Sequence, residues 1–130
     1  MPTKTGVIVF THGSRLKEGN DIMLRAVDAL RAHLPGVPVE PGFMELAEPD
    51  MYSAIDRLVA AGCDHILGYA LFLVPGKHLQ EDIPAIFRCA LAKHPGVTWE
   101  ITEPMLDDPA LLRMMEQRIR RALTPDAVTV

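Results

Sequence analysis

Two histidines of this 130-residue chain each follow an apolar segment and stand at a turn, where a side chain can reach a ligand. His12 follows the apolar residues 7–11 and opens the turn His-Gly-Ser-Arg, and His78 follows residues 71–74 and a Pro-Gly turn. Imidazole binds borderline divalent metals such as cobalt, nickel, iron and zinc, and it accepts a proton near neutral pH. Two histidines and a carboxylate can therefore form a catalytic site that leaves metal positions open for a substrate.

Carboxylates follow two further apolar segments. Glu45 comes directly after Phe43 and Met44, and Glu103 comes after residues 97–102. A carboxylate can complete a metal shell, take up a proton or orient a ligating imidazole. One histidine after a strand is more often a turn residue than a ligand, but two such histidines with a carboxylate between them favour one shared site.

The turn after His12 also carries groups that can bind an anion. Backbone N–H groups of Gly13 and Ser14 can cradle it, and the Arg15 guanidinium can pair with a carboxylate or phosphate. The alternative is a glycine turn with a solvated arginine, because neither a dinucleotide nor a phosphate-loop fingerprint is present. Lys77 is predicted to be a solvated charge at the rim of the site.

The remaining histidines and the cysteines have structural explanations. His33 lies near a predicted helix end, where the helix dipole favours a cation. His65 begins a predicted strand at the opposite edge, and His94 precedes a Pro-Gly stop. Cys63 and Cys89 form no CxxC pair, so both are predicted to be buried thiols in a reducing compartment, with a disulfide as the less favoured alternative.

Alternating strand and helix patterns must position these residues. The predicted strands cover residues 6–11, 37–44, 65–73 and 97–102, and the predicted helices cover residues 18–34, 50–61, 81–93 and 109–123. This order with short connections predicts a three-layer α/β fold with a mainly parallel four-stranded sheet and helices on both faces. Because parallel strands end at the same edge, we expect four residues there: His12, Glu45, His78 and Glu103.

Helical spacing also predicts which side chains face the core. The first helix presents one apolar stripe, made of Ile22, Ala26, Ala29, Leu30 and Leu34. The second helix presents another, made of Met51, Ile55, Leu58 and Val59. Pro38 and Pro41 weaken the second strand and place it near a sheet edge.

Composition restricts the class of protein. The length and a 48% hydrophobic content suit a single domain over residues 1–130, with a frayed tail from about residue 124. A net charge of -4 and only 5% aromatic residues disfavour nucleic acid as a partner. No apolar stretch reaches the roughly 18 residues that span a membrane, and no signal peptide is apparent, so we expect a cytoplasmic protein.

Three segments of the sequence resemble the class II tetrapyrrole chelatases, and the short sirohydrochlorin cobaltochelatases in particular. They are residues 11–15 (THGSR), residues 43–49 and residues 71–84 (LFLVPGKHLQEDIP). The resemblance extends from Gly6 to about Leu123. It implies ATP-independent insertion of a divalent metal into sirohydrochlorin or a similar tetrapyrrole, on a path to cobalamin or a related cofactor. Co²⁺ is the expected metal, with Ni²⁺ or Fe²⁺ as alternatives, and no nucleotide is expected.

The resemblance also implies roles for individual residues. The metal-site histidines of the family fall on His12 and His78, and a variable acidic position falls on Glu45. Short members are taken to pair as homodimers with the cleft between the subunits. This chain has Ala70 where many relatives have a proline before the LFL segment. The difference affects the shape of the strand and leaves the expected metal ligands unchanged.

The implied reaction gives each of these residues a role. His12 and His78 would bind and deliver the metal, one of them doubling as base, and Glu45 would orient an imidazole or relay a proton. Gly13, Ser14, Arg15 and Lys77 would grip the carboxylates of the tetrapyrrole rim.

Other classes of protein would use the same residues differently. A non-catalytic metal or tetrapyrrole carrier would use the same histidines without turnover. A phosphoryl-transfer enzyme with His12 as nucleophile should need several arginines, and only Arg15 is near in sequence. A structural α/β interaction domain gives no reason for histidines at two strand ends, so the chelatase interpretation is favoured.

Overall fold

The structure, a computed structural model, describes residues 3–74 and 76–124, without the side chains of His78 and Leu79. Its strands are Thr5–Thr11 (β1), Val39–Phe43 (β2), His65–Ala70 (β3) and Thr98–Ile101 (β4). Its α-helices are Lys17–His33 (α1), Met51–Ala60 (α2), Ile83–Ala90 (α3) and Pro109–Leu123 (α4). Two short turns of helix complete it, the π-helical His78–Asp82 (η1) and the 3₁₀-helical Met105–Asp107 (η2). The predicted frayed tail falls largely on residues 125–130, outside the described residues.

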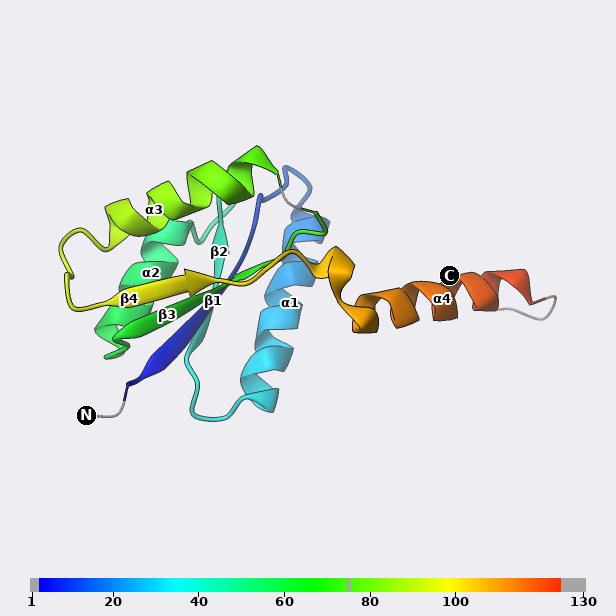
Figure 1. Cartoon of the computed structure of the whole chain (residues 1–130), viewed down its shortest axis with the longest axis horizontal. Coiled ribbons are helices and arrows are strands. Elements are labelled where there is room, and N and C mark those ends of the chain that lie inside the picture. The colour runs from blue at the N-terminus through cyan, green and yellow to red at the C-terminus, as the bar shows by residue number, and fades with distance from the viewer. Residues whose placement is uncertain (1–2, 75, 125–130) are drawn as a thin grey trace.

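The four strands form one parallel sheet in the order β2-β1-β3-β4, which confirms the predicted α/β fold. Helices lie on both faces of this sheet (Figure 1). β2 is an edge strand, as Pro38 and Pro41 predicted, because an edge strand needs fewer backbone N–H donors than a central one. The third strand is shorter than predicted and ends at Ala70, since the chain leaves the sheet after Leu71 donates its N–H to the Phe10 carbonyl at 3.0 Å.

The larger core lies between the sheet and the helices α2 and α3. Alternate residues of β1 point into it, with Ile8 and Phe10 fully buried, and β3 contributes Ile66 and Ala70. The predicted stripe of α2 is confirmed for three residues that are at most 1% exposed, Met51, Ile55 and Leu58, and Val59 is partly buried against them. Asp50 begins α2 by accepting a hydrogen bond from the Ser53 N–H at 2.7 Å, a helix-capping arrangement.

The smaller core lies under α1 and corrects the predicted stripe of that helix. α1 buries Met23 and Val27, with Leu24 partly buried beside them, whereas all five residues of the predicted stripe are exposed, Ile22 to 59%. The reason is that α1 packs mainly against the edge strand β2, so only a narrow strip of the helix meets the sheet.

The helix predicted over residues 81–93 is divided in two. It begins as the π-helical η1, and regular α-helix starts only at Ile83, with Pro84 in the first turn, where a missing N–H is tolerated. The other predicted bounds differ from the structure by at most three residues at an end.

The two cysteines differ in environment. Cys63 is buried in the larger core as predicted, and burial raises the pKa of its thiol. Cys89 is exposed on α3, so the prediction that it is buried was wrong. Cys89 lies on the flank of the short amphipathic helix α3, and Ile83 and Phe87 make the core contacts of that helix.

Tyr52 on α2 lies near Cys89. Partial burial and the neighbouring Cys89 raise the pKa of the Tyr52 hydroxyl.

The last helix, α4, extends away from the body of the molecule, as Figure 1 shows. None of its side chains is buried, and its main contacts are with the adjoining turn η2. None of the described helices is both long enough and apolar enough for a membrane span.

Candidate functional site

Two loops meet at the carboxyl end of β1 and form the centre of the candidate site. Beyond the strands, Met44 donates its N–H to the Thr11 carbonyl and Glu45 donates its N–H to the His12 carbonyl, both at 2.9 Å. Gly13 has a φ of 94°, and a Cβ added to it would lie 1.9 Å from the Glu45 carbonyl oxygen. Only glycine therefore allows the two loops to approach this closely.

These backbone contacts place the His12 and Glu45 side chains together. The His12 Nδ1 lies 3.9 Å from Glu45 Oε1, and the two side chains are 38% and 64% exposed. The pair is thus accessible to a ligand, and a carboxylate beside the Nδ1 can orient the ring so that Nε2 is presented outward. This is the first half of the predicted site.

An aromatic side chain that the sequence analysis missed supports His12 from the other side. The ring of Phe72 stands edge-on to the imidazole, with centroids 5.4 Å apart and planes inclined at 77°. Phe72 also packs on Phe10 at a centroid distance of 6.0 Å. Phe72 lies two residues beyond the end of β3, the strand that pairs with β1, whereas the sequence predicted it inside that strand, so its contact with His12 was not foreseen.

The loop that carries Phe72 leads on to His78. His78 begins η1, and its side chain lies outside the described part of the chain, so its approach to His12 stays a prediction. Among the side chains that the structure describes, no three histidine, cysteine, aspartate or glutamate residues are grouped to hold a metal ion. The described half of the site is therefore one imidazole and one carboxylate.

The predicted anion-binding turn is held together by a residue that the sequence analysis also missed. Ser14 donates its N–H to Asn20 Oδ1 at 2.9 Å, and Asn20 Nδ2 donates to the Ser14 carbonyl at 2.7 Å. The Ser14 hydroxyl accepts from the Leu16 N–H at 3.0 Å. The Ser14 N–H is thus engaged inside the loop, and the cations nearest in sequence to the two histidines, Arg15 and Lys77, are exposed.

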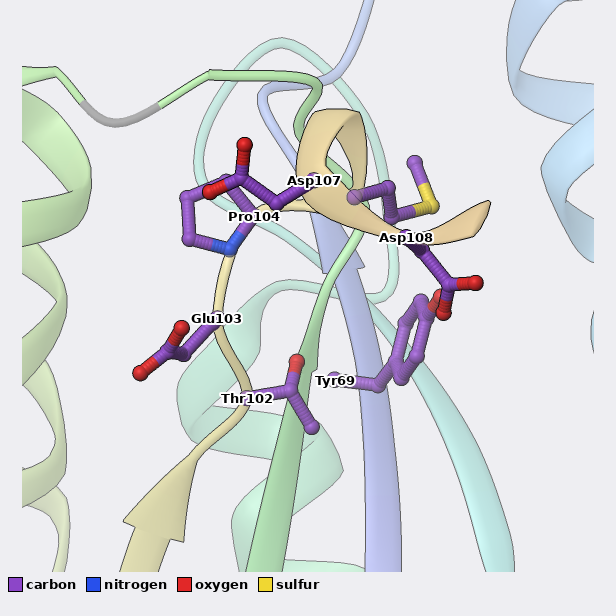
Figure 2. A pocket seen from close by; sticks show the side chains of 7 residues that line it. Tyr69, Thr102, Glu103, Pro104, Asp107 and Asp108 are labelled. Carbon is purple, nitrogen blue, oxygen red and sulfur yellow. The ribbon is translucent and has the colours of Figure 1, made fainter. Parts of the chain in front are cut away.

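Glu103 does not join His12 and Glu45. It lines a separate hollow of about 390 Å³ beside Tyr69, Thr102 and Asp108, drawn in Figure 2. Glu103 thus follows β4 at the carboxyl edge, as expected, but it belongs to this hollow and not to the His12–Glu45 pair, because β4 is the far edge strand and the chain then turns toward η2.

The CbiX family model matches residues 6–122, nearly the whole chain. The chain belongs to the CbiX family. This CbiX chain is 35% identical to the chloroplastic sirohydrochlorin ferrochelatase of Arabidopsis thaliana, over 92% of the chain and 53% of that protein. It is 29% identical to the sirohydrochlorin cobaltochelatase of Sulfolobus acidocaldarius, over 95% of the chain and 97% of that protein.

A solved structure shows the same fold. SirB from Bacillus subtilis with Fe³⁺ superposes with a TM-score of 0.87 at 24% identity, over 95% of the chain and 49% of SirB. The CbiX chain therefore spans about half the length of SirB and of the plant relative, but nearly the full length of the archaeal one.

Proposed function

We propose that this protein is a sirohydrochlorin chelatase, which inserts a divalent metal into the metal-free tetrapyrrole without ATP or another nucleotide. The observation that carries the proposal is the exposed His12–Glu45 pair at the carboxyl edge of the sheet. It is supported by the family match over residues 6–122 and by relatives that are sirohydrochlorin cobaltochelatases and ferrochelatases.

The reaction requires that two pyrrole N–H protons leave while the metal exchanges its water for four ring nitrogens. His12 and His78 bind and deliver the metal, which is a substrate here. A neutral imidazole can do this and then, once the metal has passed to the ring, accept one of the released protons. The charge of the metal lowers the pKa of the nearby pyrrole N–H groups, so metal delivery and deprotonation assist each other.

Glu45 acts through His12 in this mechanism. At 3.9 Å from Nδ1, its carboxylate orients the imidazole and relays the proton outward to solvent, to which both side chains are open. Arg15 and Lys77 pair with carboxylates on the rim of the macrocycle, since both cations are exposed. Gly13 and Ser14 contribute through the shape of the loop, because the Ser14 N–H is already bonded to Asn20.

Co²⁺ is the proposed physiological metal, with Ni²⁺ and Fe²⁺ as the alternatives. Histidine and carboxylate ligands bind these metals in the general order of affinity for divalent ions. The geometry of the site and the supply of each metal therefore decide which one is used. The proposal includes a single domain over residues 1–130, a cytoplasmic location, a role in cobalamin or related cofactor biosynthesis, and a homodimer that forms the cleft.

The test is to follow the absorbance spectrum of sirohydrochlorin incubated anaerobically with the protein and Co²⁺, Ni²⁺ or Fe²⁺ in parallel. We expect a protein-dependent rate above the spontaneous rate, fastest with Co²⁺. Binding without acceleration by any metal would identify a carrier instead, and the absence of binding would remove the proposed function.

A further inference from the structure

The side-chain amide of Asn20 binds the backbone of Ser14 at two points. Its Oδ1 accepts the Ser14 N–H at 2.9 Å, and its Nδ2 donates to the Ser14 carbonyl at 2.7 Å. Asparagine carries an acceptor and a donor side by side, so one side chain can satisfy both backbone groups of a single residue. The Ser14 hydroxyl also accepts from the Leu16 N–H at 3.0 Å, where α1 begins. The turn after β1 is thereby joined to the first turn of α1.

The place of Asn20 in the helix indicates that its role lies outside the helix. It is the fourth residue of α1, beyond the N-cap position at Leu16. Asparagine inside a helix is less favourable than alanine, because its amide competes for backbone groups. Here the amide is partly buried and bonded to the turn that precedes the helix. The residue therefore stabilises the turn at some cost to the helix.

The turn is anchored separately on the other side of Gly13. There the Glu45 N–H donates to the His12 carbonyl at 2.9 Å, so the His12 end is tied to the loop after β2. The Ser14 end is tied to α1 through Asn20. Between the two ends stands a glycine with a φ of 94°. A change at Asn20 should therefore move the Ser14 end while the contact of the His12 end with the Glu45 loop persists.

The Ser14 end of the turn leads directly into a cation beside the site. Arg15 is exposed, and in the proposed function its guanidinium pairs with a carboxylate on the macrocycle rim. The Ser14 carbonyl that Asn20 holds belongs to the planar peptide unit that ends at the Arg15 nitrogen, so this bond fixes the plane from which the arginine starts. A guanidinium is a planar fork that binds a carboxylate well only in the right direction.

We propose that Asn20 is a positioning residue for the tetrapyrrole: it sets the direction in which Arg15 leaves the turn. In this arrangement Arg15 binds the rim of the macrocycle and His12 reaches its centre, both from one four-residue turn. Asn20 thus fixes the placement of the rim relative to the metal site without touching the substrate. The inference rests on the proposed function, in which the substrate carries carboxylates on its rim.

The test is a double-mutant cycle between Asn20 and Arg15, measured as the dissociation constant of sirohydrochlorin in the absence of metal. Arg15→Ala is expected to raise this constant about tenfold or more, because a charge-assisted hydrogen bond is lost. Asn20→Ala should raise it about fivefold in the wild type and have no further effect in the Arg15→Ala background. Equal losses in both backgrounds, or wild-type affinity in Asn20→Ala, would overturn the proposal.

Asp21→Ala is the matched control on the same helix. Asp21 follows Asn20 in α1 and pairs with Lys17 at 2.7 Å, so its truncation also removes a side-chain bond from the start of the helix. It leaves the bonds to Ser14 in place, and the dissociation constant of sirohydrochlorin should stay at the wild-type value. A loss of affinity as large as that of Asn20→Ala would show that the stability of α1 matters, and not the position of Ser14.

A second variant separates the position of Ser14 from the folding of the chain. Asn20→Gln keeps both amide groups and is the better helix former, but its side chain is one methylene longer. It should unfold in urea at no lower concentration than the wild type, followed by emission of the single tryptophan, Trp99. Sirohydrochlorin should nevertheless bind more weakly, because the longer side chain displaces Ser14. Wild-type affinity in Asn20→Gln would contradict the positioning role.

These measurements separate the inference from the proposed function. A wild type that binds sirohydrochlorin but inserts no metal would contradict the chelatase activity, and the cycle between Asn20 and Arg15 would still decide the positioning role. An active chelatase whose affinity does not respond to Asn20→Ala would contradict the positioning role alone. A wild type that does not bind sirohydrochlorin would overturn both.

Discussion

His12 is the described side chain on which the proposed chemistry depends most directly. His12→Ala is expected to lower the rate of metal insertion by about 100-fold or more, because both a metal ligand and a proton acceptor are removed. His78→Ala should lose activity to a similar extent. The measurement is the initial rate of the absorbance change, with His33→Ala, an exposed histidine on α1, as the control. Wild-type rates in both site variants would contradict the assignment.

Glu45 is expected to matter less than His12, because it acts through the imidazole. Glu45→Gln keeps the size of the side chain and removes the charge 3.9 Å from Nδ1. Loss of such an orienting carboxylate typically costs 10- to 100-fold, and the high exposure of this pair favours about tenfold. Comparing kcat and KM for the metal separates the two roles of Glu45: orientation of the ligand should raise KM, and proton relay should lower kcat. No change in either would leave Glu45 without a role.

The structure brings His12 and Glu45 together as the sequence predicted, because both positions follow from one rule, that parallel strands end at the same edge. Sequence reasoning did not find Phe72 or Asn20, since an aromatic contact with an imidazole and a side-chain clamp on a turn depend on where loops lie in space. It placed Glu103 at the correct edge of the sheet but could not predict that this side chain lines a separate hollow, for the same reason. The end of a strand can be predicted, but the direction of the loop that follows cannot.

At the scale of elements, the meeting of two loops at Gly13 is the feature most sensitive to substitution. Gly13→Ala should destabilise the protein by clearly more than about 1 kcal/mol, because it combines an unfavourable positive φ with a collision against the Glu45 carbonyl. Metal insertion should fall as well, since His12 and Glu45 would move apart.

Gly36 provides the matched control for that substitution. Its φ is 84°, and an added Cβ would meet nothing within 4 Å, so Gly36→Ala introduces the backbone strain without the collision. Urea unfolding of the two variants therefore isolates the contact between the loops. Equal losses of stability would show that the approach of Glu45 to Gly13 has no energetic importance.

The elements themselves were largely predictable, and the exceptions have physical causes. Alternating apolar segments and Pro-Gly stops gave the order and approximate ends of all four strands. The stripe of α1 was wrong because helical spacing identifies apolar positions but not the width of the surface that covers them. The π-helical start at His78 leaves no signal in composition or periodicity.

At the scale of the whole molecule, the parallel sheet and its two helical layers followed from the order of elements. The position of α4 did not, because an amphipathic helix has the same pattern whether it packs on its own sheet or on that of another chain. Its last two turns carry exposed apolar residues that the predicted three-layer arrangement does not explain.

The loop between β3 and η1 connects the candidate site to the root of α4. The Phe72 ring contacts His12, while the Phe72 and Leu73 carbonyls hold Met105 and Leu106. A ligand that displaces Phe72 should therefore change how firmly the loop holds η2, which hydrogen exchange at the Met105 and Leu106 N–H groups, with and without sirohydrochlorin, would detect. Exchange rates at these two groups that do not change on binding would mean that the loop transmits nothing. One short loop thus bears on both the chemistry at the end of β1 and the direction in which the last helix leaves the body of the molecule.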